Sequence, residues 1–122
     1  MKDIETRADL ELLLSEFYST LLKDEKIAYI FTDIAKIDLE QHLPHIVDFW
    51  EQSLFGNNGY RKNVLQIHVN LNSKEKFTDT HFTTWLTHFE ATTNRLFQGI
   101  NAEKIKTRAE SIATVMKIKL YQ

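Results

Sequence analysis

Apolar residues recur every three to four positions over most of this chain, and this spacing constrains the fold more than any other feature of the sequence. The clearest run lies near the start, where the apolar positions are Leu10, Leu13, Leu14, Phe17, Tyr18, Leu21 and Leu22. Such spacing places these side chains on one face of an α-helix. Thr6 and Asp9 are placed to cap the beginning of that helix. The pattern predicts a long amphipathic helix as the first element.

Three later segments, residues 39–54, 78–98 and 101–120, show the same helical periodicity of apolar side chains. Gly99 is placed to stop the second segment, because glycine readily adopts the backbone conformation that ends a helix. Asn101 is placed to cap the third. All three segments are therefore predicted to be amphipathic helices.

Pro44 lies well inside the segment 39–54, for which Asp38 is the predicted N-cap. Beyond the first turn of a helix, a proline removes one backbone hydrogen bond, and its ring clashes with the carbonyl group four residues earlier. We therefore expect this helix either to start late or to kink near His42.

The middle of the chain is less regular. Residues 56–59, with the sequence GNNG, give the strongest loop signal. Residues 64–71 alternate like a strand but also share a helical face, and we favour a short helix because a single strand would have no partner. A short helical connector is expected between Ile27 and Ile34.

Composition supports an all-α fold. The 122 residues include only three Gly and one Pro, so the chain has few turns and long regular segments. A chain of this length forms one core, and we expect a single domain over residues 1–122. The prediction is a domain of five or six helices that is large enough to enclose an apolar pocket.

Charge and motif content exclude several function classes. The net charge of −2 gives no basic surface, so neither nucleic acid nor an anionic membrane is expected as a partner. The absence of Cys excludes disulfides, thiolate metal sites and covalently attached haem. The start of the sequence lacks the apolar core of a signal peptide, and no apolar run is long enough to span a membrane, so we expect a cytoplasmic location. Nucleotide-binding, metalloprotease and serine-hydrolase motifs are also absent.

Five His remain as the main candidates for metal chemistry. His42 and His45 lie three positions apart on one helical face, and Asp38 lies one turn before His42. A zinc or iron site at this pair would need a third ligand, which the sequence does not indicate. Two solvated surface His are therefore the favoured interpretation.

His68 differs from the other His because, in a helix, it would lie on the apolar face beside Ile67 and Leu71. A buried imidazole needs a partner for its nitrogen. From spacing alone we favour a core His bonded to a backbone carbonyl, and ligation of a haem iron is the other interpretation. Tyr18 and Trp85 could donate hydrogen bonds in such a pocket, since each carries one polar hydrogen on an apolar stripe, although simple core packing would also explain them.

Taken in order, several short motifs resemble those of the group III truncated globins. They are Phe17-Tyr18, Ile30-Phe31, His42-Leu43-Pro44, Asp48-Phe49-Trp50, Tyr60, His68 with Leu71, and Phe82-Thr83-Thr84-Trp85-Leu86. The resemblance covers nearly the whole chain, from about Ala8 to Tyr121, and extends to the absence of glycine pairs around the distal helix. It implies a globin-like two-over-two helical sandwich that holds one b-type haem, with the proximal helix reduced to a short turn. The chain departs from the family pattern after Tyr60, where residues 61–63 replace the usual Gly and Pro, so the proximal loop is expected to differ in shape.

The resemblance implies a role for each matching residue. His68 would be the proximal iron ligand, and Tyr18 and Trp85 would be the distal hydrogen-bond donors. His42 would be the distal gate, and His45 would lie near a haem propionate. The residues that it implies for the pocket lining are Phe31, Ile46, Phe49, Tyr60, Leu71, Leu86 and Phe89.

The implied function is reversible binding of oxygen, nitric oxide or another diatomic ligand at haem b. Nitric oxide detoxification and oxygen capture are the candidate roles, and nitric oxide dioxygenase is the candidate enzyme activity. An enzyme of that kind would need an external reductase, because the sequence carries no flavin or nicotinamide motif. The alternative is a haem-free helical interaction module of globin fold, in which the same aromatic residues only pack.

Overall fold

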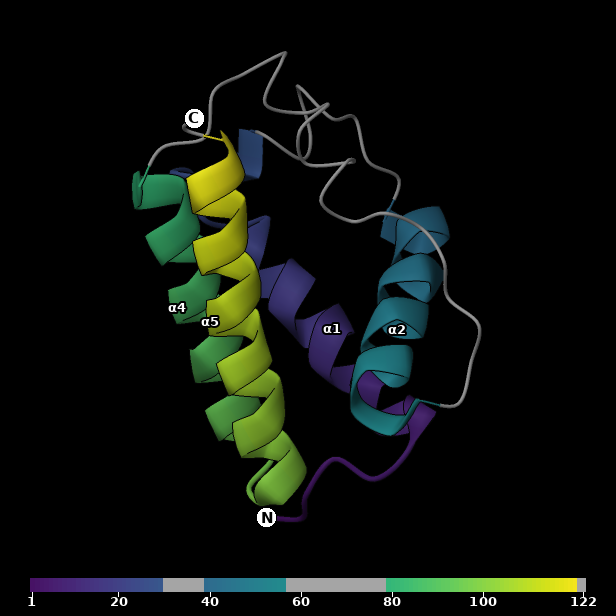
Figure 1. Ribbon diagram of the computed structural model, residues 1–122. Coiled ribbons are helices and arrows are strands. Elements are labelled where there is room, and N and C mark those ends of the chain that lie inside the picture. The colour runs from purple at the N-terminus through teal and green to yellow at the C-terminus, as the bar shows by residue number, and fades with distance from the viewer. Residues whose placement is uncertain (30–38, 57–78, 121–122) are drawn as a thin grey trace.

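The computed structural model describes residues 1–29, 39–56 and 79–120, and every regular element within these ranges is a helix. The helices are α1 (Arg7–Leu21), α2 (Leu39–Phe55), α4 (Asp79–Leu96) and α5 (Ile100–Leu120), as shown in Figure 1. The all-α prediction is confirmed. The predicted loop at 57–59 and the ambiguous segment 64–71 lie outside the described residues.

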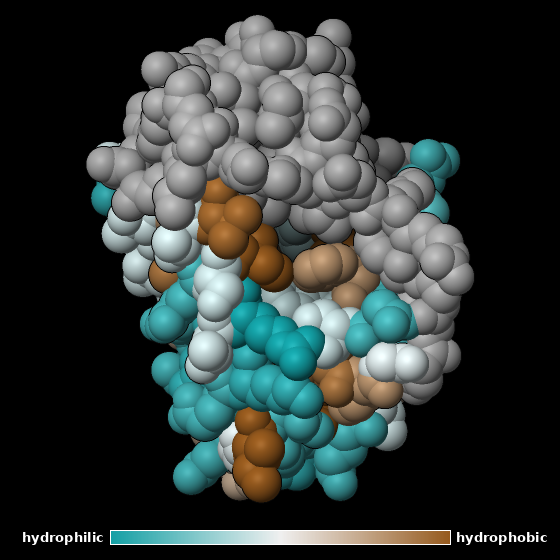
Figure 2. Space-filling view, in the orientation of Figure 1, coloured by the Kyte–Doolittle hydropathy of each residue, from teal (hydrophilic) through white to brown (hydrophobic). Residues whose placement is uncertain are grey.

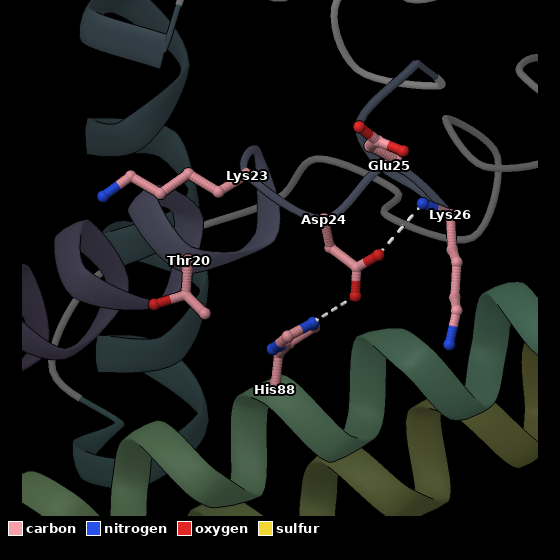
Figure 3. Close-up of a pocket in the computed structure, with 6 residues that line it drawn as sticks. All are labelled: Thr20, Lys23, Asp24, Glu25, Lys26 and His88. Atoms are coloured by element: carbon pink, nitrogen blue, oxygen red, sulfur yellow. Dashed lines mark hydrogen bonds and ion pairs between the residues drawn. The ribbon is translucent and has the colours of Figure 1, made fainter.

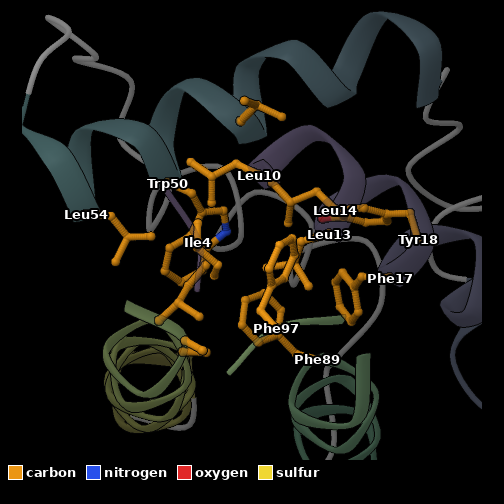
Figure 4. Packing of buried hydrophobic residues seen from close by; sticks show 14 of the residues in the cluster. Ile4, Leu10, Leu13, Leu14, Phe17, Tyr18, Trp50, Leu54, Phe89 and Phe97 are labelled. Carbon is orange, nitrogen blue, oxygen red and sulfur yellow. The ribbon is translucent and has the colours of Figure 1, made fainter. Parts of the chain in front are cut away.

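The helices form two layers of two. In Figure 4, α1 and α2 run across the view while α4 and α5 are seen end-on beneath them. α1 packs against α2 and α4, α2 also packs against α5, and α4 packs against α5. This arrangement is the predicted two-over-two sandwich. None of the described helices combines the length and apolarity that a membrane crossing requires.

α1 begins and packs as its sequence predicts. The hydroxyl oxygen of Thr6 accepts a hydrogen bond from the Asp9 backbone N–H at 3.3 Å, and the Asp9 carboxylate accepts one from the Thr6 N–H at 3.1 Å. This reciprocal capping box satisfies two N–H groups that a helix start otherwise leaves unpaired. The apolar stripe of the helix is buried, and each fully buried large side chain stabilises the fold by about 1.5–3 kcal/mol.

Pro44 does not delay the start of α2. The helix runs without interruption from Leu39 to Phe55, so the expectation of a late start is wrong. Pro44 is exposed, so its ring takes no room in the core, but the helix loses the hydrogen bond that the missing N–H would have made and has to accommodate the ring beside the carbonyl group four residues earlier. Packing of the opposite face of α2 outweighs that loss.

Asp3, rather than Asn101, caps the start of α5. The helix begins at Ile100, which places Asn101 in its first turn and makes the predicted cap wrong. The Asp3 carboxylate accepts hydrogen bonds from the backbone N–H groups of Asn101 at 2.9 Å and Ala102 at 2.8 Å. Gly99 has a φ of +148°, and a Cβ atom there would lie 2.5 Å from Asp3 Cγ. The N-terminus is thus held beside the start of α5 (Figure 1).

The core between the two layers is centred on Phe89, which is fully buried. Its ring centroid lies 5.2 Å from that of Phe17, 5.3 Å from that of Trp50 and 5.5 Å from that of Trp85. These rings come from α1, α2 and α4, so one aromatic residue joins three helices (Figure 4). Aromatic contacts of this kind each add about 0.5–1.5 kcal/mol beyond the burial of area.

Candidate functional site

The two predicted hydrogen-bond donors, Tyr18 and Trp85, both contact Phe17, and the predicted gate, His42, contacts Tyr18. The rings of Tyr18 and His42 lie edge to face, with centroids 6.5 Å apart. Phe17 contacts Tyr18 at 5.0 Å and Trp85 at 5.8 Å between centroids. The fold therefore brings residues from α1, α2 and α4 into one aromatic cluster, which we call the distal cluster.

The distal cluster offers hydrogen-bond donors in apolar surroundings. Tyr18 is buried, and burial raises the pKa of its phenol, so the hydroxyl keeps its proton at neutral pH. Trp85 is half-buried, and its indole N–H donates no hydrogen bond to any residue in the described ranges. An indole can only donate, so this N–H is suited to a ligand that accepts.

The apolar residues predicted to line the pocket fall into two groups. Ile46, Phe49 and Leu86 are half-buried on α2 and α4, at the edge of the core. Phe89 lies deeper in the core. Its ring stacks on the Trp85 indole with 19° between the ring planes, and this contact helps to fix the orientation of the indole. On the face shown in Figure 2, hydrophobic side chains gather toward the upper end of the described part, whereas its lower end is mostly hydrophilic.

Of the remaining predicted site residues, His45 is the one that lies within the described ranges. His45 is exposed on α2. Phe31, Tyr60, His68 and Leu71 lie outside the described residues, so their predicted roles stay predictions.

His81 and His88, for which the sequence predicted no role at the site, each form a hydrogen bond with a residue far away in the sequence. His81 is buried, and its Nε2 lies 2.9 Å from the Tyr29 hydroxyl. His88 Nε2 lies 2.7 Å from an Asp24 carboxylate oxygen. The signal in the sequence was their spacing from Trp85, since positions 81, 85 and 88 share one face of a helix.

An open depression of about 470 Å³ is lined by residues other than those of the distal cluster. Figure 3 shows the residues that line it, which are Thr20, Lys23, Asp24, Glu25, Lys26 and His88. The lining is charged and polar, so it does not suit an apolar cofactor. Nor do the described ranges contain a group of three His, Asp or Glu that could hold a metal ion, so they give the pair His42 and His45 no third ligand.

Comparisons with known proteins point to one family. The chain is 30% identical over 113 residues to the group 3 truncated hemoglobin ctb of Campylobacter jejuni, in a match that covers 90% of this chain and 87% of the relative. The crystal structure of the group III truncated hemoglobin from Campylobacter jejuni is similar to this fold, with a TM-score of 0.87 and 27% sequence identity. That likeness covers 100% of this chain and 97% of the other. No family model matches the sequence.

Proposed function

Because this chain belongs to the group III truncated haemoglobins, we propose that it binds oxygen, nitric oxide and other diatomic ligands reversibly at a b-type haem. The family implies the haem cofactor. The pair of hydrogen-bond donors in the distal cluster is the observation that supports a diatomic ligand. The Tyr18 hydroxyl comes from α1 and the Trp85 indole N–H from α4, and both side chains pack on Phe17.

The described residues fit a haem better than a bare metal ion. A porphyrin is a broad apolar plane and needs apolar side chains on both of its faces. Half-buried apolar residues of α2 and α4 that could supply them are Leu43, Ile46, Phe49, Phe82, Trp85 and Leu86. When bound, the haem would supply an iron that binds diatomic ligands and carries out redox chemistry. We propose His68 as the proximal ligand on the strength of the family resemblance.

Tyr18 and Trp85 would stabilise a bound ligand by donating hydrogen bonds to it. The ligand would need to accept these hydrogen bonds, and hydrogen bonds to acceptors that carry negative charge are about twice as strong as neutral ones. Burial keeps the Tyr18 hydroxyl protonated and keeps competing water away. Each donor is expected to stabilise the bound ligand by about 1–3 kcal/mol.

His42 is proposed as the gate of the pocket. Its half-buried imidazole contacts Tyr18 from the neighbouring helix. Rotation of this side chain would open or close the approach to Tyr18 without moving either helix, so it would control the rate of ligand access rather than the strength of binding.

Two donors favour slow release of oxygen, which suits oxygen capture or nitric oxide detoxification better than oxygen transport. Oxidation of nitric oxide to nitrate is therefore the enzyme activity we propose to test. Sustained turnover would require an external reductase, because the sequence contains no flavin or nicotinamide motif.

Titration of the purified protein with hemin tests the haem proposal directly. We expect a Soret band that saturates at one haem per chain, and loss of oxygen affinity on Tyr18→Phe and Trp85→Phe. A protein that remains colourless with added hemin would instead support the haem-free interaction module.

A further inference from the structure

The segment Asp24–Tyr29, the turn that follows α1, is bonded to α4 through two His side chains. One lies before Trp85 in the helix and the other after it. Asp24 Oδ2 lies 2.7 Å from His88 Nε2, as Figure 3 shows, and the Tyr29 hydroxyl lies 2.9 Å from His81 Nε2. His81, Trp85 and His88 are spaced four and three residues apart, so they lie on one face of α4. Trp85 therefore lies between His81 and His88 on this face, and both His are bonded to the turn.

Asp24 organises this turn as well as binding His88. Its backbone N–H donates to the Leu21 carbonyl at 3.1 Å and so closes the last turn of α1. Its other carboxylate oxygen accepts from the Lys26 N–H at 2.9 Å. Its carbonyl accepts from Ile27 at 3.1 Å and from Ala28 at 2.8 Å. The short stretch from Asp24 to Ala28 is thus held together by bonds to Asp24, and Tyr29 directly follows it.

The two proposed donors lie on the helices that these bonds connect. Tyr18 is on α1, which leads directly into the turn, and Trp85 is on α4. The contacts between α1 and α4 include those of the aromatic ring of Phe17 with Trp85 and Phe89. Apolar contact is non-directional and tolerates small sliding movements of one helix along another. Hydrogen bonds weaken steeply as distance and angle depart from their optimum. The two bonded His therefore add directional restraints that apolar contacts such as those of Phe17 do not provide.

We propose that Asp24 and His88, together with Tyr29 and His81, are positioning residues that set the distance and angle between the Tyr18 and Trp85 donors. This inference rests on the proposed function, because it assumes that these donors face a bound ligand. The four residues act through α4 and the turn rather than by touching the ligand.

Oxygen dissociation rates of the holoprotein, measured by stopped flow in a double-mutant cycle, test the proposal. His88→Leu removes the bond to Asp24, and we expect it to speed oxygen release by about threefold to tenfold, the equivalent of about 0.7–1.4 kcal/mol. In a Trp85→Phe background the same substitution should change the rate by less than about 1.5-fold, since the donor that it positions is gone. His88→Gln, whose amide can still donate to Asp24, should restore a rate close to that of the wild type.

Arg95→Gln provides a matched control. Arg95 pairs with Glu16 at 3.6 Å and so also joins α4 to α1, but the pair lies ten positions along α4 from Trp85 and both side chains are largely exposed. We expect no change in oxygen release from this variant. Infrared spectra of the carbon monoxide complex give a second readout, because loss of a nearby donor raises the C–O stretching frequency. His88→Leu should shift this band in the same direction as Trp85→Phe.

The proposal is overturned if His88→Leu lowers only the melting temperature, or if its effect on the rate adds to that of Trp85→Phe. It also fails if Trp85→Phe itself leaves oxygen release unchanged, and that result identifies the proposed donor role as the point of failure. Should His88→Leu not fold, Tyr29→Phe carries the same test at the second point of attachment, because it removes a single hydroxyl group.

Discussion

His42 and Tyr18 meet edge to face, with their ring centroids 6.5 Å apart and their planes at 82°. The contact joins the side chain proposed to gate the pocket with one of the side chains proposed to bind the ligand. Tyr18 is held in place by the core, since it is buried beside Phe17, whereas His42 is half-buried. His42 is therefore less enclosed by the core than Tyr18.

Shortening His42 should open the approach to the pocket. For His42→Ala we expect carbon monoxide association to become about threefold to tenfold faster, which corresponds to a barrier lowered by about 0.7–1.4 kcal/mol. Flash photolysis of the carbon monoxide complex measures this rate. Gln41→Ala is the control, because Gln41 is exposed on the same helix and has no proposed role at the site. Equal association rates in wild type and His42→Ala would remove the gate from the mechanism.

Removing either donor should speed oxygen release without preventing haem binding. For Tyr18→Phe and Trp85→Phe we expect dissociation to become roughly fivefold to a hundredfold faster, which corresponds to the loss of about 1–3 kcal/mol of ligand stabilisation. Stopped-flow displacement of oxygen by carbon monoxide gives the rate. Unchanged release in both single variants and in the double variant would show that these side chains only fill space.

Local signals in the sequence were sufficient for α1 but not for α5. The capping box of Thr6 and Asp9 lies within four residues and could be identified directly. The cap of α5 comes from Asp3, which is 98 positions before Asn101, and no local pattern reveals such a contact. The continuation of α2 through Pro44 also could not be predicted, because it depends on whether packing of the rest of the helix outweighs the local cost of the proline.

In the candidate site, too, local patterns in the sequence could be predicted but contacts between distant residues could not. Periodicity placed Tyr18 and Trp85 on apolar faces, but only the packing of three helices shows that both reach Phe17. Their proposed roles came from the ordered family motifs. The bonds of His81 and His88 to the turn after α1 were not predicted, because they join residues that are 52 and 64 positions apart.

His68 should be the His on which haem retention depends. His68→Ala is expected to lose haem or to bind it weakly, since a haem without its axial ligand keeps only apolar contacts with the protein. His81→Ala and His88→Ala should retain haem, because both residues already bond to other side chains. Hemin titration followed by the Soret band distinguishes these variants. Normal haem spectra in His68→Ala without added imidazole would disprove the assignment.

Acid should weaken the link between Asp3 and α5. Burial opposes ionisation of Asp3, but hydrogen bonds from the N–H groups of Asn101, Ala102 and Ile4 outweigh it and lower the pKa of this carboxyl. A lowered folded-state pKa gives stability that is present above the unfolded pKa of about 4 and is lost as pH falls through the folded value.

Replacement of this carboxylate tests the same link. Asp3→Ala should destabilise the fold by about 1–2 kcal/mol near neutral pH, and the difference from wild type should shrink below about pH 4. Urea unfolding at several pH values measures it. A difference that is constant down to pH 2 would contradict the ionic contribution.

Removal of haem should lower the melting temperature of the protein. Ile46, Phe49 and Leu86 are apolar but only half-buried by the rest of the chain, so contact with a porphyrin would remove more of their surface from water. A ligand that binds only the folded state stabilises it by about 4 kcal/mol at a thousandfold excess over its Kd. For a domain of this size, that free energy corresponds to a rise of about 10–20 °C in Tm. Calorimetry of the same preparation before and after haem extraction measures the difference, and readdition of hemin should restore the higher value. Equal midpoints in the two forms would mean that haem is not part of the folded core.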